Sequence, residues 1–150
     1  MEALAFRRAV AVDLAAIVAL LADDPLGSTR EGAAADPAYR EAFAAIDRDP
    51  NQLLAIAARD GRAIGVLQLS FIPGLTRRGM WRGQIEGVRI AAGERGSGLG
   101  RAMLLWAIEQ CRRRDCGLVQ LTTDKRRPDA HRFYEALGFQ ATHEGYKLML

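Results

Sequence analysis

The sequence predicts one α/β (α+β) domain that covers residues 1–150. The length of 150 residues corresponds to about one domain. Hydrophobic residues make up 49% of the chain and charged residues 26%, which is typical of a folded globular protein. Apolar β-type runs alternate with amphipathic helical segments, and a glycine-dense turn joins one such run to a helix. No repeat or linker divides the chain, so a single domain is expected.

Seven segments have the composition of strands, which predicts a sheet of about six or seven strands. They lie at 5–9, 52–59, 63–71, 80–90, 118–123, 139–143 and 146–150. Asp60-Gly61 separates the second from the third and is typical of a tight hairpin. Glu144-Gly145 separates the last two and predicts a closing hairpin.

Helical spacing and terminal signals predict four helices between these strands. The first begins at Asp13 as its N-cap and stops at Asp23-Asp24-Pro25. The second begins at Asp36-Pro37 and continues to Asp49-Pro50. The third and fourth extend from Gly98 to about Arg114 and from Asp129 to Leu137, and Gly138 is placed as the C-cap of the fourth.

Composition excludes several classes of protein. The longest apolar stretch, 14–22, is too short to span a bilayer, and the N-terminus lacks the order of a signal peptide, so a cytoplasmic protein is expected. Cys111 and Cys116 are predicted to be reduced, and no Cys/His set has zinc spacing, so no metal is expected. The net charge of +3 comes from arginines scattered among acidic residues, which indicates an anionic cofactor rather than nucleic acid.

The glycine-dense turn reads Arg-Gly-Ser-Gly-Leu-Gly over residues 95–100. Glycines at alternate positions let successive amides point at one anion, and the following helix adds the positive end of its dipole. A dinucleotide fingerprint requires glycine where Arg101 stands, and a P-loop requires a Gly-Lys pair that the chain lacks. The turn therefore predicts a phosphate-binding loop, the alternative being an ordinary strand-to-helix turn.

This loop, in the form [R/Q]-x-x-G-x-[G/A], resembles the acyl-CoA pyrophosphate loop of the GNAT superfamily of N-acyltransferases. Residues 128–139 are similar to the family's N-x-x-A-x-x-F-Y-E-x-x-G-F segment, and the element order β-α-α-β-β-β-α-β-α-β-β is the family's order. The resemblance implies a mixed sheet that splays between its two central parallel strands, with about four flanking helices. It also implies direct transfer of an acetyl group from acetyl-CoA to a primary amine of a small molecule or peptide, through a ternary complex.

The resemblance also implies site residues. Glu86, expected to alternate in phase with Val88 and Ile90, would be the base, and Tyr134 the acid that protonates the CoA thiolate. The pyrophosphate would meet amides of the glycine loop, and the pantetheine arm would pair with the strand before it. The implied cofactor-binding residues are Val88, Arg89, Ile90, Arg95, Gly96, Ser97, Gly98, Leu99, Gly100, Arg101 and Tyr134.

Other readings of these residues remain open. His131 and His143 are weaker candidates for the base, and Cys111 lies on the buried stripe of its helix, which disfavours a covalent mechanism. Asp129 replaces the family's usual Asn and is interpreted mainly as a helix cap. The expected acceptor residues are Asp23, Asp24, Glu31, Tyr39 and Trp81.

Two other functions are compatible with the sequence, and the oligomeric state is open. A CoA-binding domain without catalysis would keep the glycine loop. A nucleic-acid-binding module could use the basic runs 112–114 and 126–127, although these lack interleaved aromatic residues. Many family members are dimers, so a homodimer is a further possibility.

Overall fold

The computed structural model describes residues 3–24 and 26–150. Met1, Glu2 and Pro25, the last of which belongs to the predicted stop of the first helix, lie outside the described residues. The chain forms two compact units, one ending at Gln120 and the other extending from Leu121 to Leu150. Each unit is described by itself.

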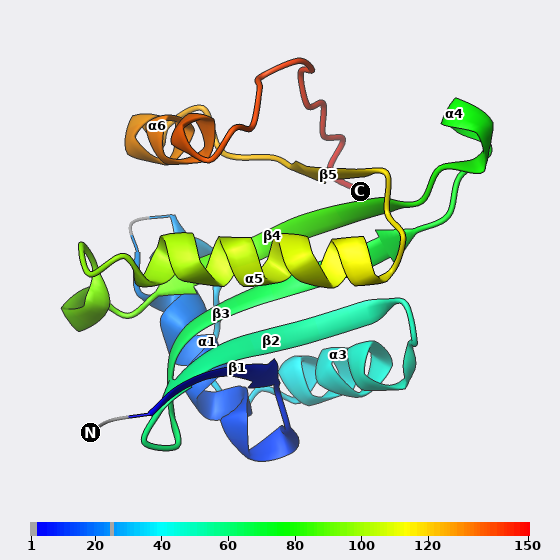
Figure 1. The fold of residues 1–150 in the computed structure, drawn as a ribbon. Coiled ribbons are helices and arrows are strands. Elements are labelled where there is room, and N and C mark those ends of the chain that lie inside the picture. The colour runs from blue at the N-terminus through cyan, green and yellow to red at the C-terminus, as the bar shows by residue number, and fades with distance from the viewer. Residues whose placement is uncertain (1–2, 25) are drawn as a thin grey trace. The chain divides into compact units, whose positions relative to one another are not determined.

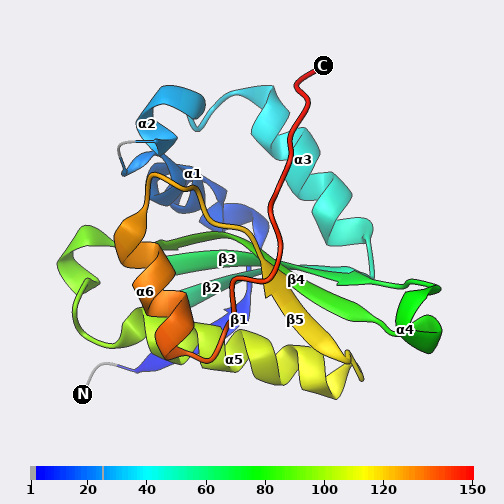
Figure 2. The same cartoon turned by 90° about the horizontal axis from the view of Figure 1, so that it is seen from above.

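A five-stranded sheet in the order β1-β2-β3-β4-β5 forms the centre of the fold. The strands are β1 (Leu4–Arg8), β2 (Gln52–Arg59), β3 (Arg62–Ile72), β4 (Arg82–Ile90) and β5 (Leu118–Leu121). The first four pair antiparallel with their neighbours. β5 lies beside β4 and runs in the same direction, so the sheet is mixed, as predicted (Figure 2). Asp60 and Gly61 both have positive φ, 51° and 78°, as a tight hairpin between β2 and β3 requires.

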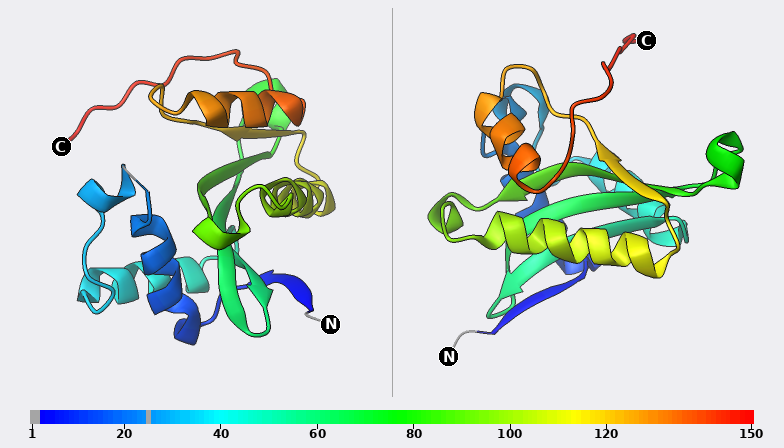
Figure 3. Two further views of the ribbon diagram at one scale, coloured as in Figure 1. Left: turned by 90° about the vertical axis from the view of Figure 1, so that its left-hand side faces the viewer. Right: turned by 45° about the horizontal axis from the view of Figure 1, so that its top comes forward.

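The helices of the first unit cover both faces of the sheet. They are α1 (Leu14–Ala22), α2 (Gly27–Arg30), α3 (Pro37–Arg48), α4 (Thr76–Gly79) and α5 (Leu99–Arg113), with 3-10 turns at Ala11–Asp13 and Ala92–Glu94. α1 and α3 lie on one face, the α1 face, and α5 lies on the other, the α5 face (Figures 1 and 3). The second unit contains α6 (Pro128–Ala136). No helix among the described residues is both long and apolar enough to cross a membrane.

Close packing between α5 and the sheet forms a large part of the core. Leu67 and Ile85 of the sheet and Met103 of α5 are each at most 1% exposed. Burying each such side chain contributes about 1.5–3 kcal/mol. Gly83 is required at this contact, because a Cβ there would lie 2.3 Å from the Sγ of Cys111. On the α1 face a second cluster packs Ile17 and other apolar side chains against β2 and β3.

The two aspartates predicted as helix caps form no capping hydrogen bond to those helices. Asp13 stands at the N-cap of α1, as predicted, but its carboxylate accepts hydrogen bonds from the Val10 amide at 2.8 Å and the Arg7 guanidinium at 2.8 Å. The hydrogen bond from Arg7 holds the pKa of Asp13 below its usual value. Asp129 lies inside the first turn of α6, where it pairs with Arg132, because the helix begins one residue earlier, at Pro128.

The closing hairpin predicted for residues 139–150 is absent, and the sheet has five strands rather than six or seven. In the described second unit these residues form neither helix nor strand. Tyr146, Leu148 and Met149 are 86–91% exposed, so the apolar side chains that suggested a strand bury little surface. A two-stranded hairpin with no packed face is marginal in water, which explains why the sequence pattern alone does not enforce it.

Candidate active site

A β-bulge interrupts β4 immediately before the glycine loop. Glu86 lies opposite Gln68 and Arg89 lies opposite Val66, so three steps along β4 match two steps along β3. Gly87 has a φ of 64°, which accommodates the extra residue. The bulge therefore changes the face of the sheet on which the side chains after it lie.

This bulge corrects the predicted phase of Glu86. Residues directly opposite each other share a face of a sheet. Glu86 and Arg89 therefore lie on the α1 face with Gln68 and Val66, whereas Ile90, opposite Gly65, lies on the α5 face. The Glu86 carboxylate is exposed and, within the described part of the chain, forms neither a side-chain hydrogen bond nor an ion pair. It is available to a ligand on the α1 face.

The end of β4 extends past its short neighbour β5. The side chain of Gln120 donates a hydrogen bond to Gln84 at 3.0 Å, and β5 ends one residue later, at Leu121. Residues 88–90 therefore lie beyond the end of β5. Their backbone groups on that edge have no partner in a described strand.

The glycine loop is open and lies directly before the N-terminus of α5. Gly96 and Gly98 have φ values of 81° and 85°, and nothing lies within 4 Å of a Cβ built at either position. Among the described residues, no protein atom accepts a hydrogen bond from the amides of Gly96 or residues 98–101. These unpaired amides and the helix dipole favour an anion at this place.

Two arginines predicted at the cofactor contact the segment directly after α1. Arg95 donates from Nη2 to the carbonyl oxygen of Asp23 at 3.2 Å. Nε of Arg89 lies 2.5 Å from Oδ2 of Asp24, with side-chain exposures of only 15% and 8%. Arg89 also donates from Nη1 to the carbonyl oxygen of Val88 at 2.8 Å. We call the Asp24–Arg89 pair the clamp, because it joins the bulged strand to the segment after α1.

Asp24 also orders the start of α2. Its Oδ1 accepts hydrogen bonds from the amides of Leu26 at 2.9 Å and Gly27 at 2.7 Å. A Cβ at Gly27 would lie 2.0 Å from the carbonyl oxygen of Leu21, so only glycine fits there. One carboxylate thus fixes both α2 and the guanidinium of Arg89.

The remaining acceptor candidates lie apart from the clamp. The Tyr39 hydroxyl donates to Glu31 at 2.8 Å and accepts from the Gly32 amide at 2.8 Å. The hydrogen bond from the Gly32 amide is the largest single influence and lowers the pKa of Tyr39, but the Glu31 carboxylate, desolvation and Asp36 together raise it, and the pKa is raised overall. Trp81 is 37% exposed at the start of β4.

In the second unit, α6 presents Tyr134 between two aromatic rings. Its ring centroid lies 5.2 Å from that of Phe133 and 5.9 Å from that of Phe139, both in edge-on geometry. Gly138, with a φ of 97°, ends the helix as predicted. His131 bonds through Nε2 to the carbonyl oxygen of Asp124 at 3.1 Å, which is a structural role.

The cysteines do not resemble nucleophiles. Cys111 is 1% exposed, as its helical position predicts, and burial raises its pKa to about 11. Burial also raises the pKa of Cys116. A thiol that stays protonated at neutral pH is a poor nucleophile, so the structure does not favour a covalent cysteine mechanism.

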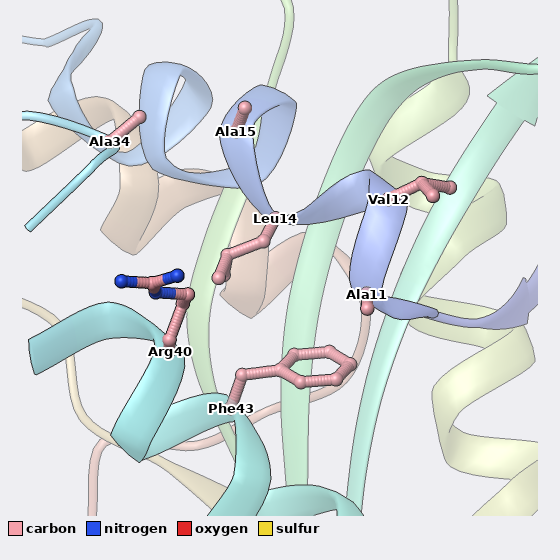
Figure 4. Close-up of a pocket in the computed structure, with 7 residues that line it drawn as sticks. All are labelled: Ala11, Val12, Leu14, Ala15, Ala34, Arg40 and Phe43. Atoms are coloured by element: carbon pink, nitrogen blue, oxygen red, sulfur yellow. The ribbon is translucent and has the colours of Figure 1, made fainter. Parts of the chain in front are cut away.

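A separate apolar hollow of about 410 Å³ lies between the start of α1 and α3 (Figure 4). Its lining residues are Ala11, Val12, Leu14, Ala15, Ala34, Arg40 and Phe43. Arg40 is the only ionisable side chain in this lining. This lining contains no carboxylate.

Sequence reasoning missed the clamp and a group of glutamines on the α1 face. The clamp joins residues 65 positions apart, Asp24 and Arg89, and no local pattern indicates such a pair. The sequence did contain a signal for this polar group. Gln68 and Ser70 stand at alternate positions of β3, and Gln84 and Glu86 at alternate positions of β4. Alternation places them on one face, and the register confirms this.

The profile of the acetyltransferase (GNAT) family matches residues 15–139. The chain is 35% identical to the aminoalkylphosphonate N-acetyltransferase of Salmonella typhimurium over 106 residues, which cover 71% of this chain and 68% of that protein. It is 37% identical to the glucosamine 6-phosphate N-acetyltransferase of Trypanosoma brucei brucei over 91 residues, 60% of this chain and 59% of that protein.

A crystal structure described as a transcriptional regulator from Bacillus halodurans C-125 matches with a TM-score of 0.94 and 46% identity, covering 99% of this chain and 100% of that one. With the sheet, the bulge and the glycine loop, these matches define the class of protein. The chain belongs to the GNAT family of acyltransferases, and its named enzymatic relatives are N-acetyltransferases.

Proposed function

We propose that residues 1–150 form a single catalytic domain that transfers an acetyl group from acetyl-CoA directly to a primary amine in a ternary complex. The observation that carries this proposal is the open glycine loop with its unpaired amides, immediately beyond a bulged strand that bears a free carboxylate. Family membership supports the acyl donor. The amine is a small molecule or a peptide amine.

The glycine loop would hold the pyrophosphate of CoA. The amides of Gly96 and residues 98–101 supply donors, and Arg95 and Arg101 are exposed cations next to them. Arg95 would exchange its bond to the Asp23 carbonyl for one to phosphate. The free edge of Val88–Ile90 would pair with the amides of the pantetheine arm, and a backbone N–H near Val88 would meet the oxyanion.

Glu86 would accept the proton of the acceptor amine, directly or through a water. An amine with a lysine-like pKa of about 10.4 is neutral in roughly one molecule in 2,500 at pH 7, equivalent to about 4.6 kcal/mol. A carboxylate on the face that a ligand reaches can remove this proton as the nitrogen attacks the thioester carbon. Its exposure and lack of a protein partner support this role.

Tyr134 would donate a proton to the departing CoA thiolate. A phenol with a pKa near 10 is protonated at neutral pH and can supply that proton. The atoms balance: the ammonium loses one proton to Glu86 and becomes the free amine, and the acyl carbon then exchanges sulfur for nitrogen. The second nitrogen proton passes to solvent as the amide forms, and sulfur gains a proton from Tyr134, which solvent reprotonates. Half-burial between two aromatic rings gives the phenol a fixed orientation.

Binding of nucleic acid is the less supported alternative, although one similar structure is described as a transcriptional regulator. Arg112 and Arg113 lie 3.7 and 3.6 Å from Glu109, and Arg114 stacks 4.1 Å over Phe71. These arginines therefore have protein partners. A silent CoA-binding domain would have no use for the free carboxylate of Glu86.

Turnover distinguishes these functions. We expect release of CoA when the protein is mixed with acetyl-CoA and a panel of amines that begins with 2-aminoethylphosphonate and glucosamine 6-phosphate, the acceptor classes of the two relatives. Tyr134→Phe should lower kcat by about tenfold or more, and a Cys111→Ala/Cys116→Ala variant should retain activity, as direct transfer requires. A folded protein that turns over no amine in a broad panel would refute catalysis.

A further inference from the structure

The α1 face of the sheet changes from apolar to polar along its strands. Leu54, Ile56 and Val66 form the apolar end, where α1 and α3 pack. Beyond Leu54, which lies opposite Gln68, polar or charged side chains predominate over four neighbouring strands, with Ile72 opposite Arg82 as an apolar neighbour. We call the polar and charged members of this set the polar lane. Its members are Gln52, Gln68, Ser70, Arg82, Gln84, Glu86 and Gln120. A sheet face is normally apolar where helices cover it and polar where it is solvated.

The lane is ordered rather than loosely solvated. Gln52 accepts hydrogen bonds from Gln68 at 2.8 Å and from Ser70 at 3.1 Å. Gln120 donates to Gln84 at 3.0 Å. These side chains are buried or half-buried and fixed across the strands, so they present amide groups in set positions.

Two opposite charges on the lane have no ion-pair or hydrogen-bond partner among the described residues. Arg82 lies opposite Ile72 and Glu86 opposite Gln68, which places both on the same face with Gln84 between them. In the described part of the chain neither forms an ion pair, whereas Arg89 on the same strand is paired with Asp24. Four residues of strand separate their Cα atoms by about 13 Å. Both side chains are long enough to lean toward a ligand between them.

We propose that the acceptor of this enzyme carries an anionic group as well as its amine, and that it binds along the lane with its ammonium at Glu86 and its anion at Arg82. This inference rests on the proposed function, in which Glu86 is the base. The Gln84–Gln120 pair lies beneath the atoms that connect the two charged groups. Phosphonate, phosphate and carboxylate share the required chemistry.

Charge complementarity selects this class of acceptor. A guanidinium offers forked donors that match the oxygens of a phosphonate or a carboxylate. A neutral amine leaves Arg82 without a counter-charge, and a diamine places a second cation against it. The lane therefore distinguishes amines by the charge of the group at the other end of the molecule from the amine.

The test compares four acceptors that share a primary amine: 2-aminoethylphosphonate, 3-aminopropanoate, propylamine and 1,3-diaminopropane. Comparison of the first two acceptors shows whether a phosphonate or a carboxylate is the preferred anion. The variants are Arg82→Gln, Arg82→Lys and, as a matched control, Arg62→Gln at the exposed start of β3. Loss of a charge-assisted hydrogen bond corresponds to about tenfold to hundredfold in kcat/KM.

We expect Arg82→Gln to lower kcat/KM for the anionic acceptors by that factor, mainly through KM, and to leave propylamine unchanged. Arg82→Lys should restore part of the loss, and Arg62→Gln should have no effect. Equal use of propylamine and the anionic amines by the wild type, or an equal loss for all four in Arg82→Gln, would overturn the inference alone. Failure of every amine with acetyl-CoA would instead remove the proposed function on which it rests.

Discussion

The position of Glu86 depends on one extra residue in β4. Without the bulge at Gly87, strict alternation would place Glu86 on the same face as Val88 and Ile90. With it, the carboxylate shares the α1 face with Arg89, and Ile90 points to the α5 core. A single backbone irregularity thus separates the proposed base from the apolar residues that follow it.

Replacing Glu86 tests its role as base. We expect Glu86→Gln to lower kcat/KM by roughly 10²–10⁴ at pH 7. The loss should shrink as pH rises toward about 10.4, because the free amine then needs no base. A pH profile of both proteins measures this. Glu109→Gln, which alters an exposed carboxylate on α5, should match the wild type. A loss that is the same at every pH would contradict the role.

Between elements, the clamp is a polar connection from the segment between α1 and α2 to β4. It links the end of α1 to β4 through a nearly buried ion pair, and Asp24 orders the first amides of α2. Breaking a buried pair leaves one charge uncompensated, which costs about 3–5 kcal/mol, whereas removing both charges costs less.

We therefore expect Asp24→Asn and Arg89→Met each to lower the free energy of unfolding by about 3–5 kcal/mol. The double variant should lose clearly less than the sum of the two, because no unpaired charge remains. Urea denaturation of the wild type, the two single variants and the double variant measures the coupling free energy between the two side chains. Strictly additive losses would indicate that the two side chains do not interact.

The contact between β4 and α5 leaves no room for a methyl group at Gly83. We expect Gly83→Ala to cost about 1–3 kcal/mol, because its Cβ would meet Sγ of Cys111 at 2.3 Å. Gly93→Ala is the matched control, since nothing lies within 4 Å of a Cβ there. Adding Cys111→Ala to Gly83→Ala should recover part of the loss. Equal melting temperatures for Gly83→Ala and Gly93→Ala would contradict this packing.

At the scale of the molecule, sequence predicted the elements that have strong local signals. The hairpin at Asp60-Gly61, the apolar strand 52–59 and the long helix after Gly98 are confirmed within two residues. Contacts between distant segments determine three other features, and no local pattern specifies such contacts. These features are the clamp, the bulge and the number of strands that the C-terminal residues add to the sheet. The strands expected at 139–143 and 146–150 fail for this reason.

The same distinction applies to the site. The glycine loop was predictable because glycine spacing directly determines backbone conformation, and Gly96 and Gly98 have the expected positive φ. The protein partners of the arginines were not predictable. Arg89 and Arg95 contact Asp24 and Asp23, which lie between α1 and α2 and are distant in the sequence.

Calorimetric titration with acetyl-CoA most directly tests whether the glycine loop binds the cofactor. We expect the wild type to bind and Gly98→Glu to lose binding, because a carboxylate would stand among the amides that receive the pyrophosphate. Gly61→Glu is the matched control: its φ of 78° is similar to the 85° of Gly98, and both positions are open. Binding that survives in Gly98→Glu, or is absent from the folded wild type, would contradict the assignment of this loop.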